Sequence, residues 1–298
     1  MRVDDTEKAC CSPNDTALEE THDDHRVRVR DAYARVALAK EKGGANGTAA
    51  GCCGGTVSGC CGGSEDEEAI NTLISTRLGY SERDLEEVPT GSDMGLGCGN
   101  PGAIASLRPG EVVVDLGAGG GFDCFLAARE VGDNGRVIGI DMTPEMVSKA
   151  RANARKGKFR NVEFRLGEIE HLPVADKTAD VIISNCVINL SPDKAQVFRE
   201  AFRILRPTGR LAISDVVATV ELPEEWRKDP QMIAGCTGNA SLIQEIESHL
   251  AAAGFTEIRI APKDESREFI RDWAPGRGVE DYVVSATIEA VKPDVSES

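Results

Sequence analysis

The chain has 298 residues, of which 41% are hydrophobic and only 4% aromatic, so its core must be mainly aliphatic, as in parallel α/β sheets. Its formal net charge is −16, which disfavours DNA or RNA as a partner because nucleic-acid binding depends on basic surfaces. The sequence has no apolar run close to the ~20 residues that cross a bilayer and no apolar secretory signal, so we expect a cytoplasmic protein without a membrane partner.

The positions of the ten cysteines carry information about function. In a reducing compartment, cysteines serve metal, metalloid or redox sites more often than structural disulfides. Helical spacing at 21–42 is followed by a glycine-rich stretch at 43–63. That stretch carries a doubled motif of paired cysteines: Cys52, Cys53, Cys60 and Cys61. We therefore describe residues 1–64 as a cysteine-rich extension, part helical and part flexible.

Residues 65–220 are expected to form a domain of alternating helices and strands. Ser64 and Ser81 suit the starts of a helix to Arg77 and of a short helix that Pro89 ends. From residue 111 onward we expect strands at 112–114, 136–140, 162–166, 181–184 and 211–214, and helices at 122–131, after Thr143 and from Ser191. Strands that alternate with helices at this spacing predict a doubly wound, mostly parallel α/β sheet.

The alternation loosens in residues 221–298, which we assign to the acceptor side of the protein. Residues 222–238 show no clear period. Later elements are a helix capped by Ser241 and Gln244 and ending near Gly254, and strands at 255–260 and 282–288.

A glycine loop at the first strand-to-helix turn predicts the cofactor. Residues 115–121 fit acidic-x-Gly-x-Gly-x-Gly, and glycines there tolerate positive φ and let a ligand approach the backbone. A dinucleotide-binding loop would need its third glycine at the position of Phe122. Here it falls at Gly121, and Asp115 suits a ligand with a cationic amino acid end better than a pyrophosphate.

Further candidate ligand residues follow the next strands in order. Asp141 closes the second strand, where a carboxylate can accept hydrogen bonds from ribose hydroxyls, and the segment after the third strand is a usual place for contacts to adenine. This order predicts a site for S-adenosylmethionine. The expected cofactor-binding residues are Asp115, Gly117, Gly119, Gly121, Asp141, Met142, Glu168, Ile169 and Asn185.

Three more cysteines lie in loop-like positions: Cys98 before the first strand, Cys186 after the fourth, and Cys236 in the irregular region. The end of the fourth strand faces the reacting methyl group in such a fold, so two thiols that reach Cys186 would complete a site with three sulfur ligands. Soft thiolates in that number suit a pyramidal trivalent metalloid. Cys124, on the inward face of helix 122–131, is expected to be an inert buried thiol.

These features resemble the arsenite methyltransferases, especially their bacterial and archaeal branch. The similarity extends from about Glu65 to Pro293. It is carried by 95–101 (GLGCGNP), the glycine loop to Leu126, 139–145, 167–173, 184–194 (beginning SNCVINL), 214–215 and 221–225. The resemblance implies the class I methyltransferase fold, a Rossmann-like doubly wound sheet. It also implies that Cys98, Cys186 and Cys236 bind As(III), and that the C-terminal third carries metalloid-binding elements.

The paired cysteines of the extension depart from the eukaryotic pattern of single cysteines ahead of the catalytic ones. Cys52, Cys53, Cys60 and Cys61 could bind arsenite, relay electrons as a disulfide, or do neither.

The expected reaction is methylation of arsenite and methylated arsenicals, as in arsenic detoxification or biotransformation. As(III) bound to thiolates keeps a lone pair that can attack a methyl group without a general base. The reaction formally oxidises arsenic, so turnover would require electrons from thiols and a dithiol reductase system of the thioredoxin or glutathione type. Two alternatives remain open, a methyltransferase for a small organic acceptor and a thiol-based metalloid chaperone.

Overall fold

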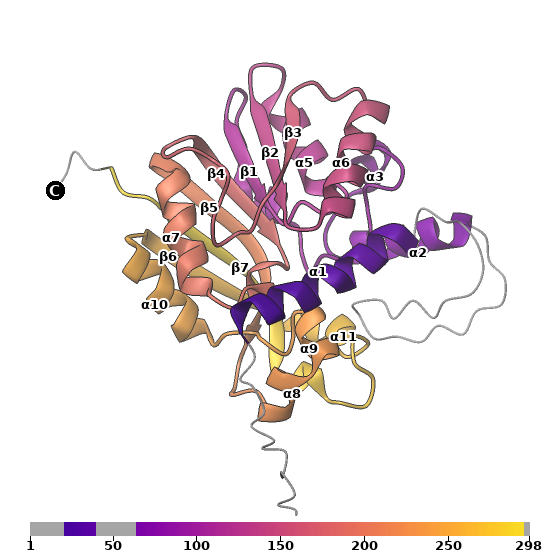
Figure 1. Ribbon diagram of the computed structural model, residues 1–298, viewed down its shortest axis with the longest axis vertical. Helices are drawn as coiled ribbons and strands as arrows, with labels where there is room; N and C mark the ends of the chain where they lie inside the picture. The colour runs from indigo at the N-terminus through magenta and orange to yellow at the C-terminus, as the bar shows by residue number, and fades with distance from the viewer. Residues whose placement is uncertain (1–20, 40–63, 295–298) are drawn as a thin grey trace, which may run out of the picture.

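The computed structural model describes residues 21–39 and 64–294, arranged as a single sheet with helices around it (Figure 1). In chain order the elements are α1 His22–Ala39, α2 Ser64–Arg77, α3 Glu82–Glu86, α4 Pro101–Ala105, β1 Val112–Leu116, α5 Phe122–Val131, β2 Arg136–Asp141, α6 Pro144–Lys156, β3 Val162–Leu166, β4 Ala179–Asn185, η1 Ile188–Leu190, α7 Lys194–Ile204, β5 Leu205–Ala218, α8 Glu224–Lys228, α9 Pro230–Ala234, α10 Ile243–Ala253, β6 Thr256–Lys263, η2 Asp264–Ser266, α11 Arg267–Ile270, η3 Val279–Asp281 and β7 Val283–Val291.

The sheet has seven strands in the order β3-β2-β1-β4-β5-β7-β6. Strands β1 to β5 pair in parallel, and β7 is antiparallel to both of its neighbours. The expected doubly wound, mostly parallel sheet is therefore confirmed. Strands β6 and β7, which follow residue 220, extend the sheet formed by β1 to β5.

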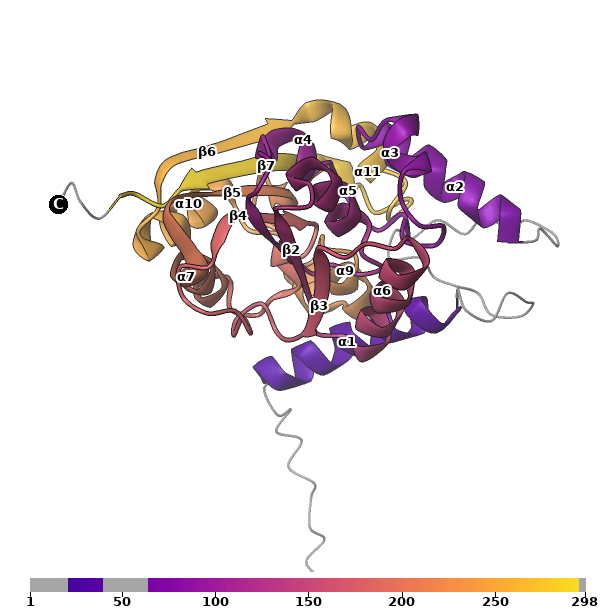
Figure 2. The same ribbon diagram turned by 90° about the horizontal axis from the view of Figure 1, so that it is seen from above.

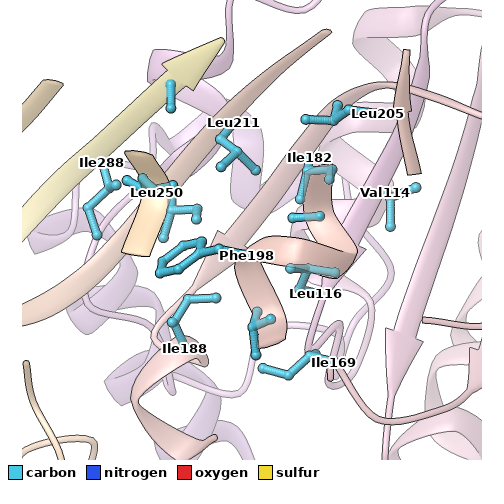
Figure 3. Packing of buried hydrophobic residues seen from close by; sticks show 14 of the residues in the cluster. Val114, Leu116, Ile169, Ile182, Ile188, Phe198, Leu205, Leu211, Leu250 and Ile288 are labelled. Carbon is cyan, nitrogen blue, oxygen red and sulfur yellow. The ribbon is translucent and has the colours of Figure 1, made fainter. Parts of the chain in front are cut away.

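Alternation along each strand builds a core on both faces of the sheet. Val114 and Ile182 belong to the cluster that packs under α7 and α10, where Phe198 is fully buried (Figure 3). Their neighbours Val113 and Val181 belong to the opposite cluster, with α5 and α6. Because both faces of the central strands are covered, polar ligands can reach the strands only at their ends.

Several boundaries differ from the sequence expectation. Helix α7 begins at Lys194 and not at Ser191, because the Asp193 carboxylate accepts the N–H of Gln196 at 2.9 Å and caps the helix. Helix α10 begins after Leu242, whose N–H donates to Glu245 at 3.1 Å, so the expected cap at Ser241 is displaced by one residue. Its end at Gly254, with φ of 102°, is confirmed.

Strand β5 is longer than expected, at Leu205–Ala218, because it pairs with β4 on one side and with β7 along much of its length on the other. The region without a clear period contains two helices of five residues each, α8 and α9, which are too short to show one. Helix α4 was not expected; Asn100 caps it by accepting the N–H of Ala103 at 3.0 Å.

Within the described residues, no helix combines the length and the apolar character needed to cross a bilayer. Cys52, Cys53, Cys60 and Cys61 lie outside these residues, as do 40–42 at the end of the first predicted helix.

Candidate active site

A pocket opens at the carboxyl ends of β1, β2 and β4, between the glycine loop and the first helices. Seven of the nine residues predicted to bind the cofactor line it: Asp115, Gly117, Gly119, Asp141, Met142, Ile169 and Asn185. Gly121 and Glu168 are not among the lining residues. Gly121 is the N-cap of α5 and has a φ of 94°, and a Cβ on it would lie 2.8 Å from the rings of Phe125 and Phe164.

The glycine loop brings bare backbone to the pocket. Gly117 has a φ of 71°, and a Cβ on it would lie 2.4 Å from a methyl group of Val187. Gly119 has a φ of 51° but nothing within 4 Å of where its Cβ would be, so the pocket borders it directly. A left-handed backbone conformation at each position favours glycine. The loop therefore leaves space that a ligand can fill.

Asp141 is held in a fixed orientation beside the loop. Its carboxylate accepts the N–H of Gly119 at 3.0 Å and the N–H of Thr143 at 2.8 Å. Burial raises the pKa of this carboxyl, and the two backbone hydrogen bonds oppose the rise. Each oxygen keeps a further lone pair, which suits the acceptance of hydrogen bonds from a diol.

A pair of carboxylates, Asp115 and Asp123, also lines the pocket. Burial, and then the neighbouring Asp123, raises the pKa of Asp115 well above its ordinary value. Burial also raises the pKa of Asp123 to about 6, although Tyr80 donates to its Oδ1 at 2.6 Å. Among the described residues no cation is paired with these two buried acids, so they fit a positively charged ligand group, which would favour their ionised forms. Sequence reasoning missed Tyr80 and Asp123, although Asp123 lies within the glycine-loop segment.

The three predicted thiols come together in one buried cluster. The sulfurs of Cys98 and Cys186 and a carboxylate oxygen of Asp215 lie within 4.8 Å of one another. Cys236 donates its thiol to the carbonyl oxygen of Cys186 at 2.9 Å. Of the three cysteines, Cys186 lines the pocket that also contains the glycine loop. The structure thus brings the three cysteines together as expected, and Asp215 is a member of the cluster that the sequence did not indicate.

Glycines and one asparagine hold Cys98 in this cluster. Asn185 accepts the N–H of Cys98 at 3.0 Å and donates to the carbonyl of Gly99 at 2.8 Å. A Cβ on Gly97 would lie 2.7 Å from the Asn185 amide nitrogen, and one on Gly99 would lie 2.8 Å from Ser214 Oγ. The Gly-Cys-Gly sequence therefore lets this backbone approach the ends of β4 and β5 closely.

Cys186 and Cys236 are held together by a relay of amide side chains. Both cysteines have positive φ, 59° and 61°, a conformation that is unfavourable for a residue with a side chain. Asn239 donates to the carbonyls of Asn189 and Ser191 at 2.9 and 3.0 Å, and so joins the segment after Cys236 to the segment after Cys186. Asn189 in turn donates to Asp215 at 2.9 Å.

Burial keeps the thiols of Cys98 and Cys186 protonated at neutral pH. It raises the pKa of Cys98, and it raises the pKa of Cys186 well above the ordinary value of a thiol. Burial also raises the pKa of Asp215 to about 6, and the backbone N–H groups of Val216 and Ile188, which donate to its carboxylate, oppose the rise. The remaining buried thiol among the described cysteines, Cys124, donates to Asp115 at 3.1 Å and lies outside the cluster.

Comparison with known proteins identifies the family. A family model described as a methyltransferase domain matches residues 107–254. An arsenite methyltransferase of Halobacterium salinarum is 51% identical over 272 residues, covering 90% of this chain and 66% of that protein. The crystal structure of an arsenic(III) S-adenosylmethionine methyltransferase from Chlamydomonas reinhardtii aligns with a TM-score of 0.55 and 32% identity, covering 74% of this chain and 73% of that one. The chain belongs to the arsenite methyltransferase family.

The fold of this arsenite methyltransferase family member is that of the class I methyltransferases. A putative sarcosine dimethylglycine methyltransferase from Galdieria sulphuraria shares the fold, with a TM-score of 0.58 at 17% identity. The chain spans 66% of the length of the Halobacterium relative, and 42% of the human arsenite methyltransferase, with which it shares 40% identity over 157 residues.

Proposed function

We propose that this chain transfers a methyl group from S-adenosylmethionine to trivalent arsenic held by Cys98, Cys186 and Cys236. Its substrates would be arsenite and methylated arsenicals. The observation that carries the proposal is the position of Cys186, which belongs both to the thiol cluster and to the lining of the glycine-loop pocket.

The residues of the pocket fit the donor along its whole length. Asp115 and Asp123 would hold the cationic amino acid end, and Asp141 would accept hydrogen bonds from the ribose hydroxyls. Ile169 and Met142 would contact the adenine end, and Gly119 offers bare backbone between the two ends. S-adenosylmethionine, when bound, supplies an electrophilic methyl group on a sulfonium sulfur.

Protonated thiols suit arsenite better than a divalent cation. When a thiol condenses with arsenous acid, an As–S bond forms, and the thiol proton leaves with a hydroxide of arsenic as water. Three such steps give a neutral complex, which can be buried without a charge. A divalent cation held by three thiolates would leave a net negative charge in a site whose burial already opposes ionisation of Cys98 and Cys186.

Arsenic bound to three sulfurs keeps a lone pair, which forms the new As–C bond, so no group on the protein has to remove a proton at that step. The chain contributes alignment of the lone pair with the methyl group. The transfer formally oxidises arsenic by two electrons. A dithiol reductant of the thioredoxin or glutathione type would restore it and be oxidised to a disulfide, which requires a reducing compartment such as the cytoplasm.

The test is to incubate the purified chain with arsenite, S-adenosylmethionine and a dithiol, and to separate the arsenic species by chromatography. Methylarsenicals that form only when all three are present would support the proposal. Bound but unchanged arsenite would favour a metalloid chaperone. Methylation of an added organic acceptor, with no binding of arsenite, would favour a different methyltransferase.

A further inference from the structure

Helix α1 lies outside the segment matched by the methyltransferase family model, yet it forms part of the donor pocket. It packs against α6 and α9, and the two views show it beside both helices (Figures 1 and 2). Arg26, Val29 and Tyr33, which recur on one face of α1, line the pocket together with the glycine loop. The donor pocket is therefore closed by a helix from the N-terminal part of the chain.

In the donor pocket, Arg26 lies beside the segment that follows β3. Its Nε lies 3.5 Å from a carboxylate oxygen of Glu168 and 3.6 Å from one of Glu170. This nitrogen is buried and has no hydrogen-bond partner within the described residues. The two ion pairs leave this buried N–H without a hydrogen bond, so a ligand acceptor that reached it would stabilise the packed position of α1.

The same helix contacts the segments that carry two of the thiols. Tyr33 donates its hydroxyl to the carbonyl of Ala234 at 3.3 Å, two residues before Cys236. His25 Nε2 lies 3.0 Å from the carbonyl oxygen of Leu190, in the turn that follows Cys186. These two contacts fix α1 to both sides of the Cys186–Cys236 pair.

The contact with the third thiol segment is apolar. Ala37 packs with Met94 of the segment that precedes Cys98, and Tyr33 packs against this small cluster. Val29, which is 1% exposed, belongs to the buried cluster that contains all three cysteines. One helix therefore contacts the donor pocket and every segment that carries an acceptor thiol.

We propose that α1 couples the two halves of the site, so that binding of the donor favours the arrangement of thiols that binds arsenite. This inference rests on the proposed function. A ligand that completes the contacts of Arg26 favours the docked helix, and the docked helix holds the three thiol segments in place. Such coupling is reciprocal, so bound arsenite must raise the donor affinity by the same factor.

The test uses the full chain and two probes, arsenite and S-adenosylhomocysteine, in titration calorimetry. The coupling factor is the Kd for arsenite alone divided by the Kd in saturating S-adenosylhomocysteine. We expect a factor of about five or more for the wild type, the lower end of ordinary coupling between sites. In Arg26→Ala and Tyr33→Ala it should fall to within about twofold of one, while each probe still binds by itself.

Arg35→Ala is the matched control, because Arg35 is exposed on the same helix and should leave the coupling factor at its wild-type value. Tyr33→Phe keeps the ring and removes only the hydroxyl bonded to Ala234, so it should lower the factor without loss of the folded state in thermal unfolding.

Three outcomes would overturn the inference: a wild-type factor in both alanine variants, a factor of one in the wild type although both probes bind, and an equal loss in Arg35→Ala. Failure of arsenite to bind the wild type at all would instead refute the proposed function, and the inference with it.

Discussion

The two halves of the proposed site, the donor half and the acceptor half that contains the three thiols, are built in opposite ways. The donor half is centred on a continuous motif, Asp115 to Gly121, and on Asp141 at the end of β2, so its central residues are close in sequence and in space. The acceptor half draws Cys98, Cys186 and Cys236 from three distant segments and holds them with side-chain amides. A local motif tolerates change elsewhere in the chain, whereas an assembled cluster depends on every segment that supports it.

The largest expected effect is a loss of arsenite methylation with donor binding retained. In Cys186→Ser we expect methylation of arsenite to fall by about a hundredfold or more, because one of three arsenic ligands is lost, which corresponds to about 2.7 kcal/mol of barrier. S-adenosylhomocysteine should still bind, as measured by calorimetry. Cys124→Ser is the matched control, since its thiol is equally buried but outside the cluster. An unchanged rate of arsenite turnover in Cys186→Ser would refute the three-thiol site.

A second variant tests whether the thiols of the acceptor half have different roles for arsenite and for monomethylarsenite. Cys98→Ser should lower methylation of arsenite by roughly thirtyfold and leave methylation of monomethylarsenite within about threefold of wild type. The reason is that a methyl group has replaced one of the thiolates that arsenic needs. Chromatography of the products from each substrate gives both rates. Equal losses on the two substrates would contradict this division of labour.

The pH dependence of donor binding should come from Asp123. The pKa of Asp123 is about 6, and only its ionised form attracts a cationic ligand group. Donor affinity should therefore fall as the pH falls through 6, by about tenfold at pH 5, one unit below that pKa. Titrations with S-adenosylhomocysteine from about pH 5 to 8 measure this slope. Asp123→Asn should bind more weakly with a flat profile, and a slope parallel to that of the wild type would assign the titration to another group.

The smallest expected effect concerns the Asn239 hydrogen bonds that join the segments after Cys186 and Cys236. Asn239→Ala removes two hydrogen bonds that hold Cys236 near Cys186, so we expect arsenite affinity to fall by about fivefold, or about 1 kcal/mol. Asn161 bridges the carbonyls of Ala128 and Gly132 at 2.9 and 3.0 Å, far from the cluster in the fold. Asn161→Ala should lose similar stability in thermal unfolding and keep wild-type arsenite affinity. Equal affinity losses in the two variants would show a general loss of stability.

Much of the donor half could be predicted, because its signals are local. A glycine triplet with positive φ and an acid at the end of the next strand have few alternative explanations once strands and helices alternate around them. Asp123 was missed because a carboxylate in the first turn of a helix is also a common helix-stabilising residue. Its partner Tyr80 lies in another segment, and only the packed structure brings the two together.

In the acceptor half, the cysteines could be recognised from the sequence, but the residues that hold them in place could not. The three cysteines stood out by their positions, whereas Asp215, Asn189 and Asn239 are ordinary polar residues in the sequence. The helices α8 and α9 could not be predicted because each has five residues and is held by tertiary contacts. The sequence of α1 did not indicate that Arg26 and Tyr33 line the pocket, because it is a charged sequence of an ordinary helical type.

The sequence by itself determined the parallel α/β pattern and the order in which candidate functional groups follow its strands. These groups are a glycine loop, acids at successive strand ends, and three separate cysteines. These are properties of local backbone conformation and of hydrophobic period, which short segments encode. The tertiary structure alone decided that the thiols share one buried cluster with Asp215, that Cys186 borders the donor pocket, and that α1 closes it. Such contacts depend on burial between segments far apart in the chain, and no short segment contains that information.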